Sequence, residues 1–374
     1  MLQIVADDKI PFLKGVLEPF AAVKYLPGSE ISREDVLQAD ALIVRTRTRC
    51  DSRLLGGTQV KFIATATIGH DHIDKDFCKN TGIVWTNAPG CNASSVMQYM
   101  ASALITIQKE RGVKLEGKTL GIIGAGHVGK LVQKLAGILG MNVLLNDPPR
   151  ERSEGAGEFT GLQQVLTQSD FVTLHVPYTI AGTDKTRHLI NAGSISLMKP
   201  SAWLINTSRG EVVETRALKA ALDLNIIAGT VLDVWENEPE IDRELLGKVF
   251  IATPHIAGYS ADGKANGTAL SVRALSTFFD LPLTAWYPEL MPGPLNEREL
   301  KKDNHESPIA FLERAVLHTY NILTDNYLLR KDPANFEKIR NYYPVRREFN
   351  AYSIQPGFLT TTEKVKFGKL GFGL

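Results

Sequence analysis

Short apolar runs alternate with amphipathic stretches along the first 90 residues of the chain. The apolar runs predict buried strands at residues 2–7, 22–27, 41–46, 61–67 and 82–88. The amphipathic stretches between them lie at residues 11–20, 32–38 and 51–57. Strands that alternate with helical patterns are typical of βαβ units, so this part of the chain is expected to form a parallel sheet.

A second alternating series follows a long apolar segment. Residues 92–110 predict one helix, because apolar positions recur at helical spacing after an Asn and two Ser residues. Helical patterns follow at 128–140 and 215–225. Strand patterns occur at residues 119–124, 142–147, 170–176, 202–207, 227–234 and 249–255. The chain therefore predicts two α/β units.

The last hundred residues have a different character. A predicted helix at 268–280 leads into a proline-rich segment at 281–297, which is typical of a linker. A helical pattern returns at 308–323, and the remainder is alternating and charged. We expect a small extra domain here.

Composition narrows the class of protein. The chain has 374 residues, of which 44% are hydrophobic and 22% charged, and 42 Lys and Arg nearly balance 41 Asp and Glu. This balance gives no reason to expect nucleic acid or a membrane as a partner. Three cysteines without a CxxC pair are expected to be reduced thiols, and the first residues do not form a secretory signal. A soluble cytoplasmic protein is predicted.

A glycine-rich turn gives the first sign of chemistry. Gly124, Gly126 and Gly129 form G-x-G-x-x-G between a predicted strand and a predicted helix. Gly124 would allow the tight turn, Gly126 the approach of a pyrophosphate, and Gly129 close packing of helix on strand. The phosphates would meet the N–H groups of His127 and Val128 at the positive end of the helix.

An acidic residue follows at the expected distance. Asp147 ends the next predicted strand, 18 residues after the last glycine of the turn. A carboxylate there can accept hydrogen bonds from ribose hydroxyls and would repel a 2′-phosphate, which favours NAD over NADP. Arg150 lies nearby and could compensate a 2′-phosphate.

Four side chains suited to catalysis follow three successive strands of the second unit. Arg209 follows one strand, Asp233 and Glu238 the next, and His255 the one after. Ligands of open parallel sheets bind beyond the carboxyl ends of the strands, so these residues are expected to face one crevice. His255 could accept a hydroxyl proton during hydride transfer, Glu238 could fix its tautomer, and Arg209 could clamp a substrate carboxylate.

These motifs, "GxGxxG", "NTSRG", "DVWENEP" and "TPHIAG", resemble the D-isomer-specific 2-hydroxyacid dehydrogenase family in order and spacing. The resemblance implies that Arg209, Glu238 and His255 are catalytic and that NAD is the cofactor. It also implies that several residues line the nicotinamide, namely Val176, Thr207, Ser208, Asp233 and Gly258. The chain departs from the family at Gln98, where most members carry Glu, and this position is expected to be structural.

Further features resemble one branch of that family, which oxidises the 2-hydroxyl of 4-phospho-D-erythronate in pyridoxal 5′-phosphate biosynthesis. They are "NAPGCNASSV", "HIAGYSADGKANGT" and the tail with "FEKIRNYYPVRREFNAYSI". The resemblance places Thr46, Thr67 and Tyr259 at the substrate. Arg45, Arg47 and Arg49 could add positive charge for the phosphate, and which of them touches it stays open.

The resemblance also implies an architecture. We expect a flavodoxin-like substrate domain from residues 1–93 and 256–285, and a Rossmann NAD-binding domain from 94–255. Residues 286–374 would form a small α+β dimerisation domain, so a homodimer is expected.

Two alternatives remain at this stage. The chain could be another D-2-hydroxyacid dehydrogenase, such as one acting on 3-phosphoglycerate, or an NAD-sensing binding protein related to corepressors. The run "IGHDHID" lacks the completing ligands of a metal site, so no metal is expected. Whether NADH leaves after each turnover or is re-oxidised in place by a 2-oxo acid is not decided by the sequence.

Overall fold

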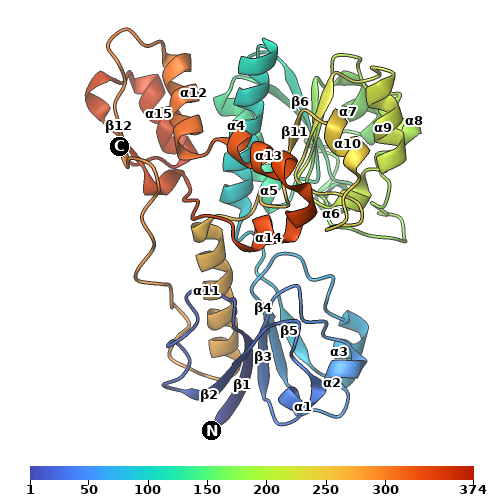
Figure 1. Ribbon diagram of the computed structural model, residues 1–374, viewed down its shortest axis with the longest axis vertical. Coiled ribbons are helices and arrows are strands. Elements are labelled where there is room, and N and C mark those ends of the chain that lie inside the picture. Colours follow the sequence, from blue (N-terminus) through green and yellow to red (C-terminus); the bar gives the residue numbers. More distant parts are fainter. The chain divides into compact units, whose positions relative to one another are not determined.

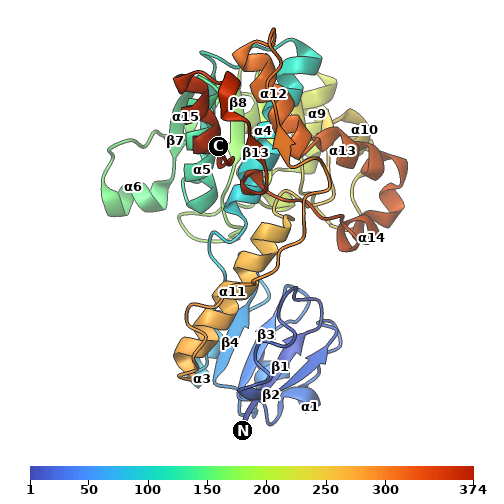
Figure 2. The same ribbon diagram turned by 90° about the vertical axis from the view of Figure 1, so that its left-hand side faces the viewer.

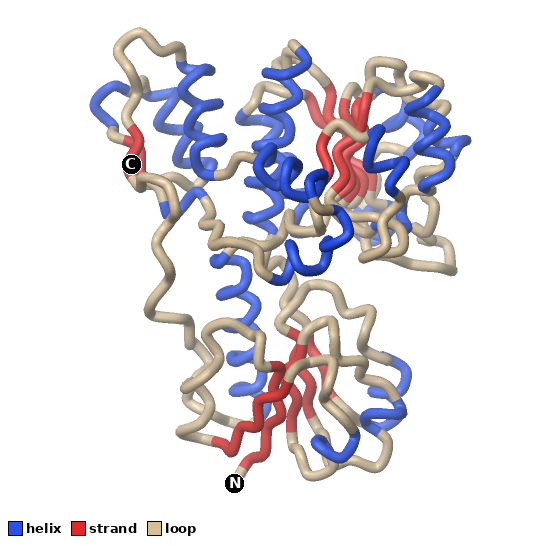
Figure 3. Tube along the Cα trace, viewed as in Figure 1, coloured by secondary structure: helices blue, strands red, loops and turns tan.

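The computed structural model describes residues 1–357 and 359–374 in full and residue 358 by its backbone alone. The chain forms two compact units, Met1–Asn92 with Ser260–Pro292, and Ala93–Tyr259 with Gly293–Leu374. Each unit contains its own large parallel sheet, drawn in red in Figure 3. Among the described residues, no helix combines the length and apolar character that crossing a bilayer requires.

The first unit is a five-stranded parallel sheet in the order β2-β1-β3-β4-β5. Its elements are β1 (Leu2–Asp7), β2 (Ala21–Leu26), α1 (Arg33–Val36), β3 (Ala41–Val44), α2 (Ser52–Leu55), β4 (Phe62–Thr65), α3 (Lys75–Thr81), β5 (Val84–Thr86) and α11 (Ala261–Phe278). This order is flavodoxin-like, and its switch point lies between β1 and β3. The predicted sheet is confirmed.

Both faces of this sheet are covered, which explains its nearly continuous apolar strands. On one face, Leu42 and Ile63 pack with buried residues of α1, α2 and α3. On the other face, Val272 and Leu275 join Phe62 in a second buried cluster. Figure 1 shows their helix α11 beside the strands of this sheet. The helix α11 begins at Ala261, earlier than the predicted 268, because the Ser260 hydroxyl caps its first turn by accepting from Gly263 N.

The amphipathic stretch at residues 11–20 folds as turns. Gly15 adopts a φ of +86°, and the Glu18 carboxylate accepts hydrogen bonds from Gly15 N at 2.9 Å and Leu17 N at 3.1 Å. These side-chain contacts satisfy backbone groups that a helix would otherwise use.

The second unit contains a six-stranded parallel sheet in the order β11-β10-β9-β8-β6-β7. Its elements up to residue 252 are α4 (Ala93–Arg111), β6 (Thr119–Ile123), α5 (His127–Ile138), β7 (Asn142–Asn146), α6 (Pro148–Glu154), α7 (Leu162–Gln168), β8 (Phe171–Leu174), α8 (Ala192–Ile195), β9 (Trp203–Asn206), η1 (Gly210–Val212), α9 (Thr215–Asp223), β10 (Gly229–Leu232), α10 (Arg243–Lys248) and β11 (Ile251–Ala252). The order reverses between β6 and β8, which places the ligand crevice of a Rossmann fold there. The predicted fold and the helix α4 are confirmed.

The tail packs onto this second sheet unit. Its elements are β12 (Glu299–Leu300), α12 (Pro308–Thr319), α13 (Ile322–Lys331), η2 (Pro333–Asn335), α14 (Phe336–Asn341), η3 (Phe349–Ala351), β13 (Ser353–Ile354), η4 (Pro356–Phe358) and α15 (Thr361–Leu370). Figure 2 shows α15 beside α5 and α12 beside α4. Phe311 and Phe367 of the tail share one buried cluster with Tyr99 of α4 and Leu135 of α5. The tail thus belongs to the same compact unit as the NAD-binding fold, and its role in dimerisation stays a prediction.

Candidate active site

The three glycines of the turn after β6 lie in different environments. Gly124 has a φ of +95°, and a Cβ there would come within 2.4 Å of the His175 carbonyl oxygen. A Cβ at Gly129 would lie 2.1 Å from the Gly124 carbonyl oxygen. A Cβ at Gly126 would meet no atom within 4 Å, and its φ is −73°. The fold itself therefore requires glycine at 124 and 129, whereas the space above Gly126 is open for a ligand.

This open space fits a dinucleotide. Gly126 is the N-cap of α5, and the backbone of His127 and Val128 begins the helix. The first N–H groups of a helix lack acceptors within it and carry its positive dipole end, so they suit a pyrophosphate. When NAD is bound, these residues would hold its phosphates, and NAD would supply a hydride acceptor.

Asp147 directly follows β7 and is the N-cap of α6, beside the same turn. Its Oδ2 accepts a hydrogen bond from Ala125 N at 2.9 Å, and its Oδ1 accepts one from Arg150 N at 3.1 Å. The Arg150 guanidinium donates to the Ala125 carbonyl at 2.7 Å and forms an ion pair with Glu154 at 2.6 Å. Because Glu154 pairs with Arg150, the Arg150 charge is not free to bind a 2′-phosphate. The Asp147 carboxylate could then accept hydrogen bonds from ribose hydroxyls, which favours NAD.

His175 and Val176 follow β8 on the other side of the switch point. The His175 ring contacts the Thr173 hydroxyl at 3.1 Å and the Thr207 hydroxyl at 3.3 Å. Burial lowers the pKa of His175 to about 3, so this imidazole is neutral at ordinary pH. So low a pKa makes this ring a much weaker base near pH 7 than an ordinary imidazole. A Cβ at Gly124 would lie 3.0 Å from Val176 Cγ1, so Val176 borders the glycine-rich turn.

The loop that carries Arg209 is fixed by Asn206, which sequence reasoning did not single out. The Asn206 side-chain oxygen accepts from Ser208 N at 3.0 Å, and its amide donates to the Arg209 carbonyl at 2.8 Å. Arg209 Nη1 donates to the Ser208 carbonyl at 2.8 Å. A Cβ at Gly210 would lie 1.9 Å from the Trp235 carbonyl carbon, so the two loops touch through their backbones. Glycine after Arg209 is required by this contact.

The structure brings Glu238 and His255 together. Glu238 Oε2 lies 2.7 Å from His255 Nδ1, and its Oε1 accepts a hydrogen bond from Trp235 N at 2.9 Å. Burial alone would raise the pKa of Glu238, but the charge of His255 and these hydrogen bonds outweigh it, so the pKa is lowered. An ionised carboxylate therefore faces one ring nitrogen of His255, whose side chain is 26% exposed.

Asp233 holds the turn that presents His255. Its Oδ1 accepts from the Thr253 hydroxyl at 2.6 Å and from Ile256 N at 2.8 Å, and its Oδ2 accepts from Ala257 N at 2.8 Å. The Asp233 carbonyl accepts from His255 N at 2.7 Å. These bonds support a φ of +58° at His255, a conformation that side chains other than glycine rarely adopt. Asp233, predicted to line the nicotinamide, thus also organises the backbone of the site.

Two residues predicted to bind substrate lie in the first unit. Thr46 is exposed just after β3, at the switch point of that sheet, and Thr67 follows β4. The Thr67 hydroxyl contacts that of Thr65 at 2.8 Å and donates to the Gly69 carbonyl at 2.9 Å. Arg45 donates to the Lys9 carbonyl at 3.1 Å.

Three other histidines have neighbours of their own. His188 Nε2 lies 2.7 Å from Glu236, which also accepts from Thr215 N at 2.8 Å, so this pair joins loops. His72 contacts the Thr65 hydroxyl at 3.1 Å, and His70 stacks on Trp85 with ring centroids 5.2 Å apart.

Gly258 and Tyr259 follow His255 closely in the chain, and the Tyr259 ring contacts residues of the tail. The centroids of Tyr259 and Tyr343 are 6.1 Å apart, nearly edge to face, and the Arg340 guanidinium lies 5.2 Å from the Tyr259 centroid. The tail therefore contacts a predicted substrate residue directly.

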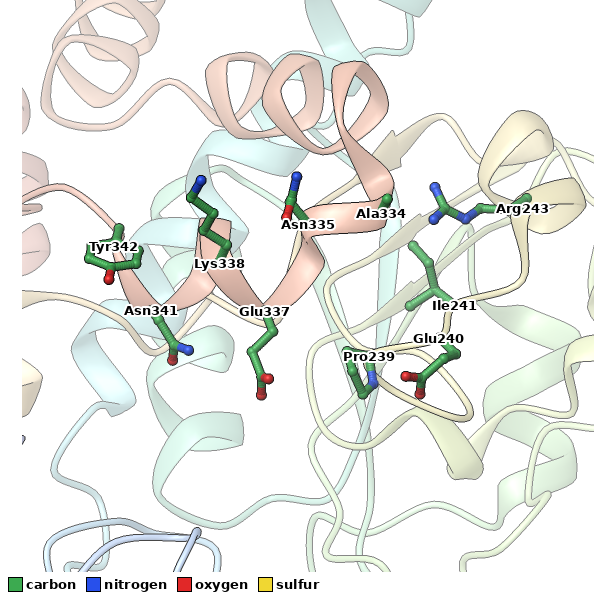
Figure 4. Close-up of a pocket in the computed structure, with 10 residues that line it drawn as sticks. All are labelled: Pro239, Glu240, Ile241, Arg243, Ala334, Asn335, Glu337, Lys338, Asn341 and Tyr342. Carbon is green, nitrogen blue, oxygen red and sulfur yellow. The ribbon is translucent and has the colours of Figure 1, made fainter. Parts of the chain in front are cut away.

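A cavity of about 610 Å³ lies between the tail and the loop after Glu238. Figure 4 shows α14 along one wall, and residues 239–243 along the other. The lining consists of Pro239, Glu240, Ile241, Arg243, Ala334, Asn335, Glu337, Lys338, Asn341 and Tyr342. It includes none of Arg209, Glu238 and His255, so this cavity is separate from the catalytic set.

Comparison with protein families agrees with the geometry. Residues 93–257 match the D-isomer specific 2-hydroxyacid dehydrogenase, NAD binding domain. Residues 290–371 match a domain of unknown function, DUF3410. Erythronate-4-phosphate dehydrogenase of Bacteroides thetaiotaomicron is 49% identical over 354 residues, which cover 94% of this chain and 99% of the relative. The protein of the same name from Porphyromonas gingivalis is 39% identical over 369 residues, 98% of each chain.

Solved structures of related enzymes share the fold over about three quarters of this chain. D-lactate dehydrogenase of Aquifex aeolicus, complexed with NAD and lactic acid, has a TM-score of 0.62 and 28% identity, covering 74% of this chain and 95% of that one. The 3-phosphoglycerate dehydrogenase of Entamoeba histolytica, with bound NAD⁺, has a TM-score of 0.63 and 25% identity, covering 75% and 96%. The chain is thus an NAD-dependent dehydrogenase, and it belongs to the erythronate-4-phosphate dehydrogenases within the D-isomer specific 2-hydroxyacid dehydrogenase family.

Proposed function

We propose that the chain oxidises the 2-hydroxyl of 4-phospho-D-erythronate to the 2-oxo acid with NAD, as a step of pyridoxal 5′-phosphate biosynthesis. The observation that carries the proposal is the 2.7 Å contact between Glu238 and His255 Nδ1, because it leaves Nε2 to act on a substrate hydroxyl. The similarity to relatives of that name extends through the tail and supports the choice of substrate.

His255 is the proton acceptor in this mechanism. As the hydride leaves carbon 2, the hydroxyl proton passes to His255 Nε2, and the carbon–oxygen bond becomes a carbonyl. The ionised Glu238 carboxylate stabilises the imidazolium that forms and keeps the ring oriented. His175 is not assigned this role, because its lowered pKa makes it a much weaker base than an ordinary imidazole.

Arg209 is the anchor for the substrate carboxylate. A guanidinium binds a carboxylate through two parallel hydrogen bonds, which orients the neighbouring carbon 2. Asn206 and the close contact at Gly210 hold the Arg209 backbone against the loop that carries Glu238. The three catalytic side chains are therefore supported by one connected set of backbone contacts.

The test is a comparison of substrates with the purified full chain. NADH formation is followed with 4-phospho-D-erythronate, 3-phospho-D-glycerate and D-lactate at equal concentrations. A single-turnover measurement of bound NADH fluorescence covers the case in which NADH stays bound until a 2-oxo acid re-oxidises it. We expect the highest kcat/KM with 4-phospho-D-erythronate. A preference for 3-phosphoglycerate would overturn the substrate, and NAD binding without turnover of any acid would favour a binding protein.

We also propose that the chain acts in the cytoplasm as a homodimer assembled through its tail. Exposed apolar side chains on the tail support this, among them Ile309 at 52%, Tyr327 at 61% and Val365 at 50% exposure. Light scattering of the full chain should give twice the monomer mass, and Ile309→Asp with Val365→Asp should lower it. A monomer at assay concentrations would contradict the assembly.

A further inference from the structure

The tail places a cation against a residue of the predicted substrate site. Arg340 lies at the end of α14, and its guanidinium carbon is 5.2 Å from the centre of the Tyr259 ring. Tyr343 packs edge-on against the same ring at 6.1 Å. Tyr259 follows His255 by four residues, so this cluster of Tyr259, Arg340 and Tyr343 adjoins the catalytic turn.

Arg346 connects the tail to the backbone next to this cluster. Its Nη2 donates to the Ala257 carbonyl at 2.6 Å and also to the Ser95 hydroxyl, and its guanidinium lies 4.4 Å from the centre of the Tyr320 ring. Arg346 is only 5% exposed. It therefore ties the tail to the catalytic turn and is not available to a ligand.

A second anchor holds the part of the tail on either side of α14. Asp325 of α13 accepts hydrogen bonds from the hydroxyls of Tyr320 and Tyr343, both at 2.8 Å. These bonds are buried or half-buried, where their strength is greatest. The backbone before and after Arg340 is thus held at both ends.

The Arg340 guanidinium has few partners for its hydrogen-bond donors among the described residues. In the part of the chain that the structure describes, no carboxylate forms an ion pair with it, and its buried Nε has no hydrogen bond. A guanidinium that lies over an aromatic ring can still donate hydrogen bonds to an acceptor in its own plane. Its positive charge also helps to lower the pKa of Glu238, which places it in the field of the catalytic pair.

We propose that Arg340, stacked on Tyr259, binds the phosphate group of the substrate, so that the tail supplies a specificity residue to the active site. The proposal rests on the proposed function. The substrate has two anionic ends, and Arg209 is assigned to the carboxylate. Arg340 would then add a guanidinium for the phosphate to the positive charge expected from Arg45, Arg47 and Arg49. A phosphate would accept a hydrogen bond from the Arg340 Nε, which has no partner among the described residues.

The experiment compares Arg340→Ala, Arg340→Lys and the control Lys338→Ala, which alters another cation of α14. Each is assayed with 4-phospho-D-erythronate and with D-erythronate, which lacks the phosphate. Arg340→Ala should lower kcat/KM for the phosphorylated acid by roughly 10- to 100-fold, the value of a charged hydrogen bond, and change D-erythronate turnover less than twofold. Arg340→Lys should restore part of the loss, and Lys338→Ala should resemble the wild type.

Equal losses for both acids would overturn the proposal, because Arg340 would then act on Glu238 or on folding. An unchanged kcat/KM would overturn it as well. Calorimetric titration with inorganic phosphate gives a measure that does not depend on turnover: wild type and Lys338→Ala should bind it more tightly than Arg340→Ala. If the wild type does not oxidise 4-phospho-D-erythronate, the proposed function fails, and phosphate binding alone then decides whether Arg340 forms an anion site.

Discussion

Gly126 and Gly137 allow the role of the glycine-rich turn to be separated from its fold. Both lie in or beside α5, and a Cβ at either would meet no protein atom within 4 Å. Gly126→Ala should therefore fold, with a loss of stability of about 1 kcal/mol, because Ala is a poorer N-cap than Gly. If the pyrophosphate of NAD lies above Gly126, however, the new methyl group would occupy its space.

The expected cost to binding follows from packing. Forcing a methyl group into a filled site costs roughly 1–3 kcal/mol, which corresponds to a rise in Kd for NAD of about 5- to 150-fold. Calorimetric titration with NAD measures the Kd, and urea unfolding measures stability. Gly137→Ala is the matched control, because Gly137 lies in the last turn of α5, where Ala should be tolerated with a gain of at most about 1 kcal/mol and an unchanged Kd.

Two results would refute this reasoning. A wild-type Kd in Gly126→Ala would mean that the pyrophosphate does not lie there. A loss of stability well beyond 1 kcal/mol would mean that the space above Gly126 is not open in the folded chain. Gly129→Ala supplies the contrasting case, because its Cβ would lie 2.1 Å from the Gly124 carbonyl oxygen and should destabilise the fold before any ligand is added.

Further substitutions test the catalytic set. His255→Asn should lower kcat by roughly 100- to 10,000-fold and leave the Kd for NAD unchanged, because the proton acceptor is lost. His175→Asn replaces an imidazole with a pKa of about 3, so kcat/KM should still fall at acidic pH as it does in the wild type. Loss of that acidic fall in His175→Asn would contradict the assignment of His255. Folding lowers the pKa of Glu238, so its ionised form stabilises the fold above about pH 5, and this contribution is lost as the pH falls through the lowered pKa. The difference in unfolding free energy between wild type and Glu238→Gln should therefore shrink on acidification. A difference that stays constant with pH would contradict the lowered pKa. Gly210→Ala places a Cβ 1.9 Å from a backbone carbon of the neighbouring loop and should cost about 1–3 kcal/mol and much of kcat/KM; a fully active, stable variant would show that the loops can separate freely.

Local patterns were sufficient to predict both sheets and the cofactor turn. Apolar strands separated by helical stretches, and three glycines at fixed spacing after a strand, each depend on neighbours within about thirty residues. The stretch at 11–20 did not follow its amphipathic pattern, because the Glu18 carboxylate and the positive φ at Gly15 stabilise turns instead. Such competition between side chain and backbone leaves little trace in hydrophobic periodicity.

The supports of the site were harder to foresee. Asn206 is an unremarkable strand-end residue in sequence, yet it fixes the loop of Arg209 through both of its side-chain groups. The backbone contact between Gly210 and Trp235 and the three hydrogen bonds to Asp233 join segments whose pairing no periodicity encodes. The contact of Arg340 with Tyr259 depends on how the tail docks, which a local pattern cannot specify.

The bond between Arg346 and the Ala257 carbonyl has a consequence for synthesis of the protein. The two residues are 89 positions apart, so Arg346 is added to the growing chain well after Ala257. At roughly 5–20 residues per second, a ribosome adds Arg346 about 4–18 s after the catalytic turn has been made. The nascent chain can therefore form both sheets while its catalytic turn still lacks this partner. A polypeptide released before residue 346 would lack this bond, and its catalytic turn would be without the support of Arg346.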